Sequence, residues 1–184
     1  RHRGNDGNES ADFESASMKN IFLTGPPSSE KTTAIKKVVA GLKRSAKGFY
    51  TQKIHVNGKR QGFKMITLAG KEGLLGHRDI KSAYTVLKDG ISIENVDNIA
   101  VPSIIKDNQS QIIILDEIGK MECFSEKFKE AALQALGSNN TVIGTIAIGG
   151  TDFMRKIKNR CDRKIIEVTE SNRNELPEKI LNIM

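Results

Sequence analysis

The stretch Asn20-Ile21-Phe22-Leu23-Thr24-Gly25-Pro26-Pro27-Ser28-Ser29-Glu30-Lys31-Thr32 holds the clearest structural pattern in the chain. Its first five residues are mostly apolar and predict a short buried strand, which Gly25-Pro26-Pro27 closes with a tight loop. After Thr32, as far as about Ser45, apolar residues recur at helical spacing between lysines, namely Ile35, Val38, Val39 and Leu42. The stretch therefore predicts a strand, a loop and a helix in immediate succession.

The loop between this strand and this helix has the residue types of a phosphate-binding loop. The pattern Gly-x-x-x-x-Gly-Lys-[Ser/Thr] is met at Gly25, Lys31 and Thr32. In such a loop backbone N–H groups and the helix N-terminus surround phosphate oxygens, the lysine reaches the β- and γ-phosphates, and the hydroxyl holds Mg²⁺. Glu30 replaces the glycine of the sixth position, where a side chain crowds the backbone and a carboxylate repels phosphate.

A second motif is an aliphatic strand, Gln111 to Leu115, followed by two acidic residues. Its composition is typical of a central parallel strand buried on both faces. Asp116 is expected to bind the water shell of Mg²⁺ opposite Thr32, and Glu117 to polarise an attacking water as general base. Taken alone, the pattern favours an ordinary strand that leaves the core. Its combination with the loop predicts a nucleotide site.

The rest of the chain predicts alternating strands and helices. Gly48 is expected to end the first helix, and two strands joined by the hairpin turn Asn57-Gly58 follow at Phe49–Val56 and Gly62–Leu68. Residues 69–97, rich in Gly and polar side chains, carry no clear prediction. Further helices are expected at 99–106, with Pro102 in the first turn, at 125–137 with Ser125 as cap, and at 172–184; further strands at 141–148 and 165–168. This order predicts an α/β three-layer sandwich with a mostly parallel sheet and an inserted β-hairpin.

The whole chain has 184 residues and a formal net charge of +7, which fit one ordinary domain. Its longest aliphatic run, Ile112 to Leu115, is far shorter than the roughly 20 residues of a membrane span. Cys123 and Cys161 form no CxxC pair and indicate the reduced thiols of a cytoplasmic protein. Composition therefore excludes a disulfide-rich secreted domain, a membrane protein and a zinc finger.

The polar residues 1–17 predict a disordered tail or an expression remnant before a natural start at Met18. The domain is expected over residues 18–184, where 27 basic and 18 acidic side chains leave a net charge of +9. Such a surplus suits polyanions, which include nucleotides and nucleic acid, but the chain has no RNP or helix-turn-helix signature. It also lacks the Asn-Lys-x-Asp signature of guanine specificity.

Several segments resemble the THEP1-type nucleoside-triphosphatases. They are Gly25-Pro26-Pro27 with Lys31-Thr32-Thr33, Gly48-Phe49-Tyr50-Thr51, Gly62-Phe63, Asp116-Glu117-Ile118-Gly119-Lys120-Met121-Glu122, and Glu167-Val168-Thr169 to Asn172-Arg173 and Leu176-Pro177. The similarity covers essentially all of residues 18–184, and the segment that begins at Asp116 is its most specific part. The resemblance implies a RecA-like P-loop fold and Mg²⁺-dependent hydrolysis of several nucleoside triphosphates, ATP and GTP among them, to diphosphate and phosphate.

The resemblance also implies roles for individual residues. Lys31 and Glu117 would be catalytic, and Thr32 and Asp116 would hold the metal. The nucleotide-binding residues would be Gly25, Pro26, Pro27, Ser28, Ser29, Glu30, Lys31, Thr32, Thr33, Asp116, Glu117 and Gly119. The family loop usually reads Gly-Val-Gly where this chain has Ser28-Ser29-Glu30, so both glycines are absent.

Three functions agree with these motifs. The first is an NTP phosphohydrolase; the second is a nucleotide-binding protein whose turnover is weak or lost because of Glu30. The third is a small nucleoside or polynucleotide kinase, for which the sequence shows no acceptor motif. Outside the motifs, structural roles are favoured. A solvated basic face is favoured over an arginine finger for Arg155, Arg160 and Arg163. Packing is favoured over base stacking for Phe49, Tyr50 and Phe63, and over nucleophilic chemistry for Cys123.

Overall fold

The strands in residues 19–110 and 112–184, the part that the computed structural model describes, form one sheet. They are β1 (Asn20–Thr24), β2 (Ala46–Val56), β3 (Lys59–Thr67), β4 (Glu72–His77), β5 (Thr85–Val86), β6 (Asp89–Ile91), β7 (Ile112–Ile118), β8 (Thr141–Ile146) and β9 (Arg163–Glu167). Their spatial order is β5-β6-β4-β3-β2-β7-β8-β1-β9. The tail expected over residues 1–17 lies outside the described residues.

This sheet has a parallel half and an antiparallel half. β2, β7, β8, β1 and β9 run parallel, as the α/β prediction requires. The other half starts at the β2–β3 hairpin, where Asn57 and Gly58 have the φ angles of 52° and 74° that a tight hairpin turn favours. β4, β6 and β5 then extend the hairpin with antiparallel pairs. The inserted hairpin is therefore confirmed, and the insertion also takes in most of residues 69–97.

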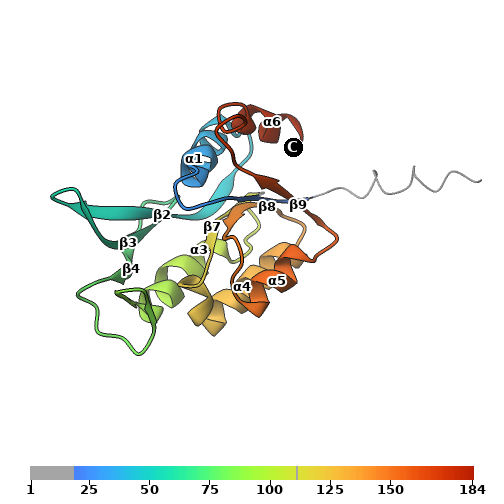
Figure 1. Ribbon diagram of the computed structural model, residues 1–184. Coiled ribbons are helices and arrows are strands. Elements are labelled where there is room, and N and C mark those ends of the chain that lie inside the picture. The colour runs from blue at the N-terminus through green and yellow to red at the C-terminus, as the bar shows by residue number, and fades with distance from the viewer. Residues whose placement is uncertain (1–18, 111) are drawn as a thin grey trace, which may run out of the picture.

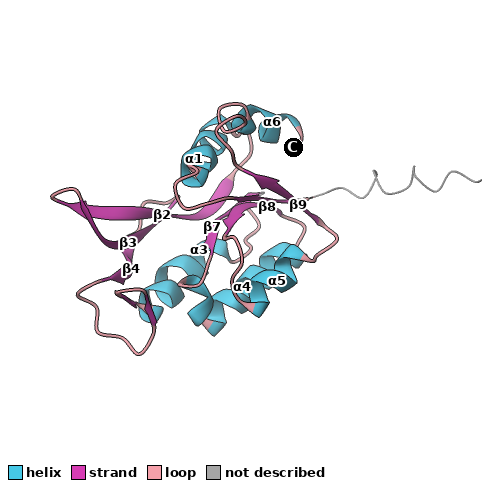
Figure 2. Cartoon of the chain, viewed as in Figure 1, coloured by secondary structure: helices cyan, strands magenta, loops and turns pink. Residues whose placement is uncertain are grey.

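Helices cover both faces of the parallel half and make the three layers that the sequence predicted (Figures 1 and 2). One face carries α1 (Lys31–Gly41) and α6 (Leu176–Asn182). The other carries α3 (Val101–Ile104), α4 (Glu126–Gly137) and α5 (Asp152–Lys158). Short helical turns lead into α3 and α4: α2 (Ile93–Asn95), a π-helical turn at Val96–Ala100 and a 3₁₀ turn at Glu122–Phe124. None of the helices in the described residues is long and apolar enough to cross a membrane.

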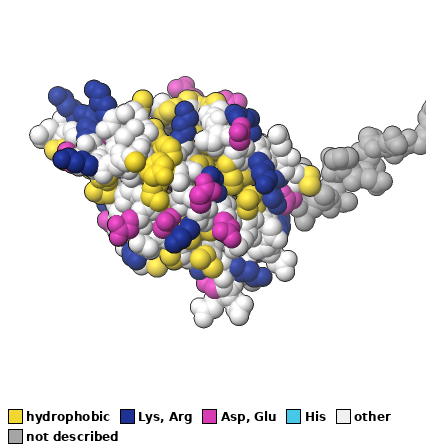
Figure 3. Space-filling view, turned by 90° about the horizontal axis from the view of Figure 1, so that it is seen from below, with side chains coloured by type: hydrophobic (Ala, Val, Ile, Leu, Met, Phe, Trp, Pro, Cys, Tyr) yellow, Lys and Arg dark blue, Asp and Glu magenta, His cyan; other side chains and the backbone are white. Residues whose placement is uncertain are grey.

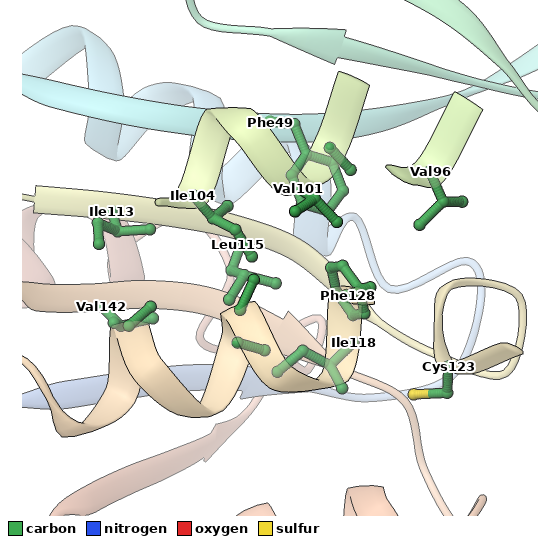
Figure 4. Packing of buried hydrophobic residues seen from close by; sticks show 14 of the residues in the cluster. Phe49, Val96, Val101, Ile104, Ile113, Leu115, Ile118, Cys123, Phe128 and Val142 are labelled. Atoms are coloured by element: carbon green, nitrogen blue, oxygen red, sulfur yellow. The ribbon is translucent and has the colours of Figure 1, made fainter. Parts of the chain in front are cut away.

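The strand pleat divides the core between the two helical layers. In β7, Ile112 and Ile114 pack with α1 and α6, whereas Ile113 and Leu115 pack with α3 and α4. Figure 4 shows the second cluster, in which the ring of Phe128 on α4 meets Phe49 on β2 edge to face, 6.1 Å between centroids. Both faces of β7 are thus buried, as its aliphatic sequence predicted.

The end of the first helix differs from the prediction. α1 ends at Gly41, not near Ser45, and Leu42 is already extended. Gly48 does not end a helix, because it lies inside β2. Its φ is 129°, and a Cβ there would stand 1.9 Å from the Ile114 carbonyl oxygen, so the close approach of β2 to β7 requires glycine. Glycine is required at this position by a tertiary contact, which the neighbouring residues in the sequence do not reveal.

Other boundaries also shift. The helix predicted at 99–106 belongs to a helical run from Ile93 to Ile104 whose first turn is capped by Ser92, since its Oγ accepts the Asn95 N–H at 3.2 Å. The basic segment from Arg155 begins inside α5, which the sequence did not predict. The helix predicted at 172–184 is shorter, at 176–182. The strands predicted at 141–148, 165–168 and 111–115 are seen at 141–146, 163–167 and 112–118, and Gln111 lies outside the described residues. The cap at Ser125 is confirmed, because its Oγ accepts the Phe128 N–H at 3.0 Å.

Replacement of Gly48 by alanine should destabilise the fold. The positive φ costs about 1–2 kcal/mol and the forced contact with β7 about 1–3 kcal/mol more. Gly58→Ala is the matched control, because its φ is also positive but no atom lies within 4 Å of its Cβ position. Urea unfolding of both variants measures the difference. Equal losses of unfolding free energy would contradict the required close approach.

Candidate active site

The first loop and the acidic pair meet at the edge of the sheet where the parallel strands end. β1 and β7 flank β8 and run in the same direction, so the residues that follow β1 and end β7 reach the same edge. A cavity of about 780 Å³ opens there. Most residues of the loop from Gly25 to Thr33 line it together with Asp116 and Glu117, and β2 and β3 add Thr51, Gln52, Lys53 and Phe63.

The loop keeps a bend that suits an anion although its glycines are missing. Glu30 has φ 65° and ψ 35°, the left-handed conformation for which glycine is the usual residue. The Ser29 N–H donates to the Pro26 carbonyl at 3.0 Å, and the Ala34 N–H makes the first helical bond to Glu30 at 3.1 Å. The first-turn amides before Ala34 have no partner inside the helix and lie at its positive end. This end of α1 is therefore suited to bind phosphate oxygens.

Lys31 folds back over this loop. Its Nζ donates to the carbonyl oxygens of Gly25 at 2.7 Å and Pro26 at 3.1 Å. Burial lowers the pKa of the ammonium, while the charges of Glu117 and Asp116 act in the opposite direction. A partly desolvated cation whose partners are neutral carbonyl groups is suited to pair with an anionic phosphate.

The Glu30 carboxylate forms an ion pair with an arginine outside the loop. Its Oε2 lies 3.7 Å from Nε of Arg173, in the segment before α6, and 54% of the side chain is exposed. Solvent and the arginine therefore both screen its charge. The repulsion expected from the sequence is weakened by this placement.

Asp116 and Thr32 are brought together as predicted. The Thr32 hydroxyl donates to Oδ2 of Asp116 at 2.7 Å, and the Thr145 hydroxyl on β8 donates to Oδ1 at 2.6 Å. Asp116 is only 2% exposed, and this burial raises its pKa, although the two hydroxyl groups favour the ionised form. A hydroxyl and a carboxylate next to a phosphate loop are the hard oxygen ligands that Mg²⁺ prefers.

These residues fit a magnesium ion that the substrate helps to hold. No group of three or more His, Cys, Asp or Glu side chains in the described residues is arranged to hold a metal ion by itself. Mg²⁺ commonly takes one or two protein oxygens and completes its shell with water and phosphate oxygens. The donor set of Thr32 and Asp116 is of that kind.

A third buried acid, Glu122, was missed as a site residue. It is 2% exposed, and its Oε2 accepts the Gly119 N–H at 3.1 Å. A Cβ on Gly119 would stand 2.7 Å from Oε1 of Glu117 and 3.0 Å from Oε2 of Glu122, so the two carboxyl groups flank one glycine. Burial raises the pKa of both groups, and each is raised further by a neighbouring carboxylate, Asp116 for Glu117 and Glu117 for Glu122. The pKa of Glu122 is raised further than that of Glu117, in keeping with its deeper burial.

The remaining candidates fall outside the site or at its rim. None of the three arginines in the basic segment lines the cavity. Arg155 pairs with Asp152, Arg160 pairs with Asp162, and Arg163 donates to the Lys158 carbonyl. Cys123 is buried in the core, which raises the pKa of its thiol to about 12 and agrees with a packing role. Phe63 lines the cavity, unlike Phe49. Two lysines that the sequence did not single out, Lys36 and Lys53, also line it, and Lys53 belongs to a hairpin whose far end is rich in basic side chains (Figure 3).

A phosphate loop after β1, with an acidic pair at the end of β7 facing it, defines a nucleotide-binding protein of the P-loop class. A family model described as NTPase matches residues 20–181. Nucleoside-triphosphatase THEP1 of Thermotoga sp. (strain RQ2) is 43% identical over 165 residues, which cover 89% of this chain and 94% of the relative. The human cancer-related nucleoside-triphosphatase is 35% identical over 179 residues, which cover 86% and 92%.

A solved structure agrees with these matches. The crystal structure of THEP1 from Aquifex aeolicus has a TM-score of 0.82 at 32% identity and covers 89% of this chain and 98% of that chain. The chain therefore belongs to the THEP1 family of nucleoside-triphosphatases, as its motifs indicated.

The ion pair at Glu30 predicts a small effect of its charge on nucleotide binding. Glu30→Gln should change the Kd of a non-hydrolysable ATP analogue by less than about fivefold, because an exposed charge at short range is worth about 1 kcal/mol in water. Arg173→Ala should weaken binding in the wild type but not in the Glu30→Gln background. Calorimetric titration of the four proteins tests this. A more than tenfold gain from Glu30→Gln alone would show that the carboxylate reaches the phosphate site.

Proposed function

We propose that the protein is a Mg²⁺-dependent phosphohydrolase of broad base specificity, which converts a nucleoside triphosphate and water into diphosphate and phosphate. The observation that carries this proposal is the contact of Thr32 with Asp116 beside the loop, with Glu117 next in the chain and facing the same cavity. The names of the relatives support the reaction class. Two free thiols, Cys123 and Cys161, agree with a cytoplasmic location.

The mechanism follows from the positions of these side chains. The amides at the start of α1 and the ammonium of Lys31 bind the β- and γ-phosphates and offset their charge. Thr32 and Asp116 would hold Mg²⁺, which when bound neutralises charge on the phosphate oxygens. Glu117 accepts a proton from water as the water oxygen bonds to the γ-phosphorus. The bond from that phosphorus to the bridging oxygen breaks, and the diphosphate leaves.

Broad base specificity is supported by the other wall of the cavity. It includes Phe63, Ala147 and Ile148, which offer apolar surface to a base of any kind. The polar residues beside them are Thr51, Gln52, Lys36 and Lys53. The Arg60 guanidinium lies 4.8 Å from the Phe63 ring centroid and braces that ring. Aromatic and aliphatic contacts accept any base, so ATP and GTP are both expected substrates.

A second candidate is a nucleotide-binding protein with weak or lost turnover. The observation that favours it is the left-handed backbone of Glu30, a conformation that costs a residue with a Cβ about 1–2 kcal/mol. Replacement by glycine removes that strain. A rise of more than about tenfold in kcat for Glu30→Gly, from a wild type that binds but barely turns over, would favour this candidate.

Glu117→Gln should separate binding from catalysis. Loss of the base should lower kcat for phosphate release by at least about a hundredfold, since general bases contribute 10²–10⁴. The Kd of the non-hydrolysable analogue should change little, because the amide has the same shape. Glu130→Gln, at an exposed position on α4, is the matched control. Unchanged phosphate release in Glu117→Gln would assign the base to another group.

Asp116→Asn tests the metal site. Loss of the carboxylate charge should raise the Mg²⁺ concentration for half-maximal phosphate release by roughly tenfold or more, because an amide is a weaker ligand. Thr145→Val is a control that removes a hydrogen bond to the same carboxylate but no proposed metal ligand. A Mg²⁺ titration of the three proteins measures the shift. The same Mg²⁺ requirement in Asp116→Asn and the wild type would exclude Asp116 as a metal ligand.

A further inference from the structure

The cavity continues past Glu117 into a second chamber of about 210 Å³. The two spaces share the lining residues Thr51, Phe63, Glu117, Ala147 and Ile148. Glu117 therefore borders both the space beside the phosphate loop and the space behind it. A molecule in the second chamber therefore contacts the proposed base, and the chamber adjoins the space beside the loop.

The second chamber is larger than hydrolysis requires. At about 30 Å³ per molecule it has room for roughly seven waters, whereas the reaction uses one. Its walls are largely apolar. They include Leu75 from β4, Val86 from β5, Met154 from α5, and Met121 in the turn after β7. Apolar walls hold water poorly, and methionine side chains adapt to the shape of a ligand. These properties are typical of a site for a small organic molecule.

The polar groups of the chamber indicate what kind of molecule fits. Glu117 and Glu122 offer carboxyl oxygens, and Lys120 adds one ammonium group at the rim. One ammonium group beside two carboxyl groups and apolar walls gives an anionic ligand little to pair with. The carboxyl oxygens, in contrast, are hydrogen-bond acceptors for the hydroxyl groups of an uncharged ligand.

We propose that this chamber binds a small uncharged polyol, and that the protein transfers the γ-phosphoryl group of the nucleotide to a hydroxyl group of the polyol. This proposal rests on the proposed function. The hydroxyl oxygen bonds to the γ-phosphorus, the bond to the bridging oxygen breaks, and the hydroxyl proton passes to Glu117. The products are a phosphate monoester and the nucleoside diphosphate. Water in the same position gives hydrolysis, so one cavity serves two acceptors.

The test follows the label of [γ-³²P]ATP in one reaction mixture. Wild-type protein with Mg²⁺ is incubated with glycerol or D-ribose, and chromatography separates labelled ester from labelled phosphate. Glycerol 3-phosphate, which has the same carbon chain as glycerol and a negative charge, is the matched poor acceptor. We expect labelled ester from at least one uncharged probe, and at least about tenfold less from glycerol 3-phosphate.

Variants that fill the chamber connect the transfer to this site. Val86→Phe should reduce ester formation at least about tenfold and leave phosphate release near the wild-type value, because water needs far less room than a polyol. Val86→Ile should give an intermediate loss; Val86 is partly exposed on a short edge strand, so both changes are compatible with folding. Leu74→Phe is the matched control, since Leu74 is 38% exposed and does not line the chamber, unlike Leu75.

Two results would overturn the proposal. Phosphate release without labelled ester from either probe would mean that the chamber accepts water only. Equal ester formation by Val86→Phe and the wild type would place the acceptor elsewhere. Absence of both products would instead contradict the proposed hydrolase, and the transfer with it.

Discussion

The hydrogen bond from the Thr32 hydroxyl to the Asp116 carboxylate is the contact on which the site depends. It joins the first turn of α1 to the end of β7, and Thr145 adds β8 from the other side of the same carboxylate. Burial of an isolated carboxylate is costly, and these two hydroxyl groups offset part of that cost. The loop, the proposed metal ligand and the proposed base are therefore held in one relative position before any substrate arrives. Phosphoryl transfer depends on preorganisation of this kind, because most of the catalysis of this reaction comes from positioning and electrostatic stabilisation.

The acids around this contact act as a set. Asp116 and Glu122 are buried, and Glu117 between them is partly buried. The positive charge of Lys31 lowers the pKa of Asp116 and of Glu117 and so acts against the effect of burial. Like charges at short range in a buried site cannot all be ionised at low cost, which is why the pKa of each of these carboxyl groups is raised. A magnesium ion would relieve the same repulsion beside Asp116. The site is thus less stable alone than with its proposed ligands, and the hydrogen bonds of Gly119, Thr32 and Thr145 keep it assembled.

The sequence predicted those parts of the fold whose cause is local. The strand, loop and helix at the start, the hairpin turn at Asn57-Gly58 and the cap at Ser125 all follow from neighbouring residues. Gly48 was misread because its glycine serves the approach of β7, which lies more than sixty residues later in the chain. Glu122 was missed for a similar reason: the approach of its carboxyl group to Glu117 depends on the turn at Gly119. Non-local strand pairing likewise explains why the sequence carried no prediction of β4, β5 and β6.

The antiparallel extension determines what surrounds Glu117. The parallel half positions the loop and the acidic pair, and it lines one side of the second chamber through Ala147, Ile148 and Met154. β3, β4 and β5 line the other side of this chamber through Phe63, Leu75 and Val86, so the insertion deepens an open edge into a partly enclosed chamber. A base placed in this way acts on the molecules that fit the chamber, and the apolar walls reduce its contact with water. The choice between water and an alcohol as acceptor is therefore made by strands that contribute none of the proposed phosphate or metal ligands.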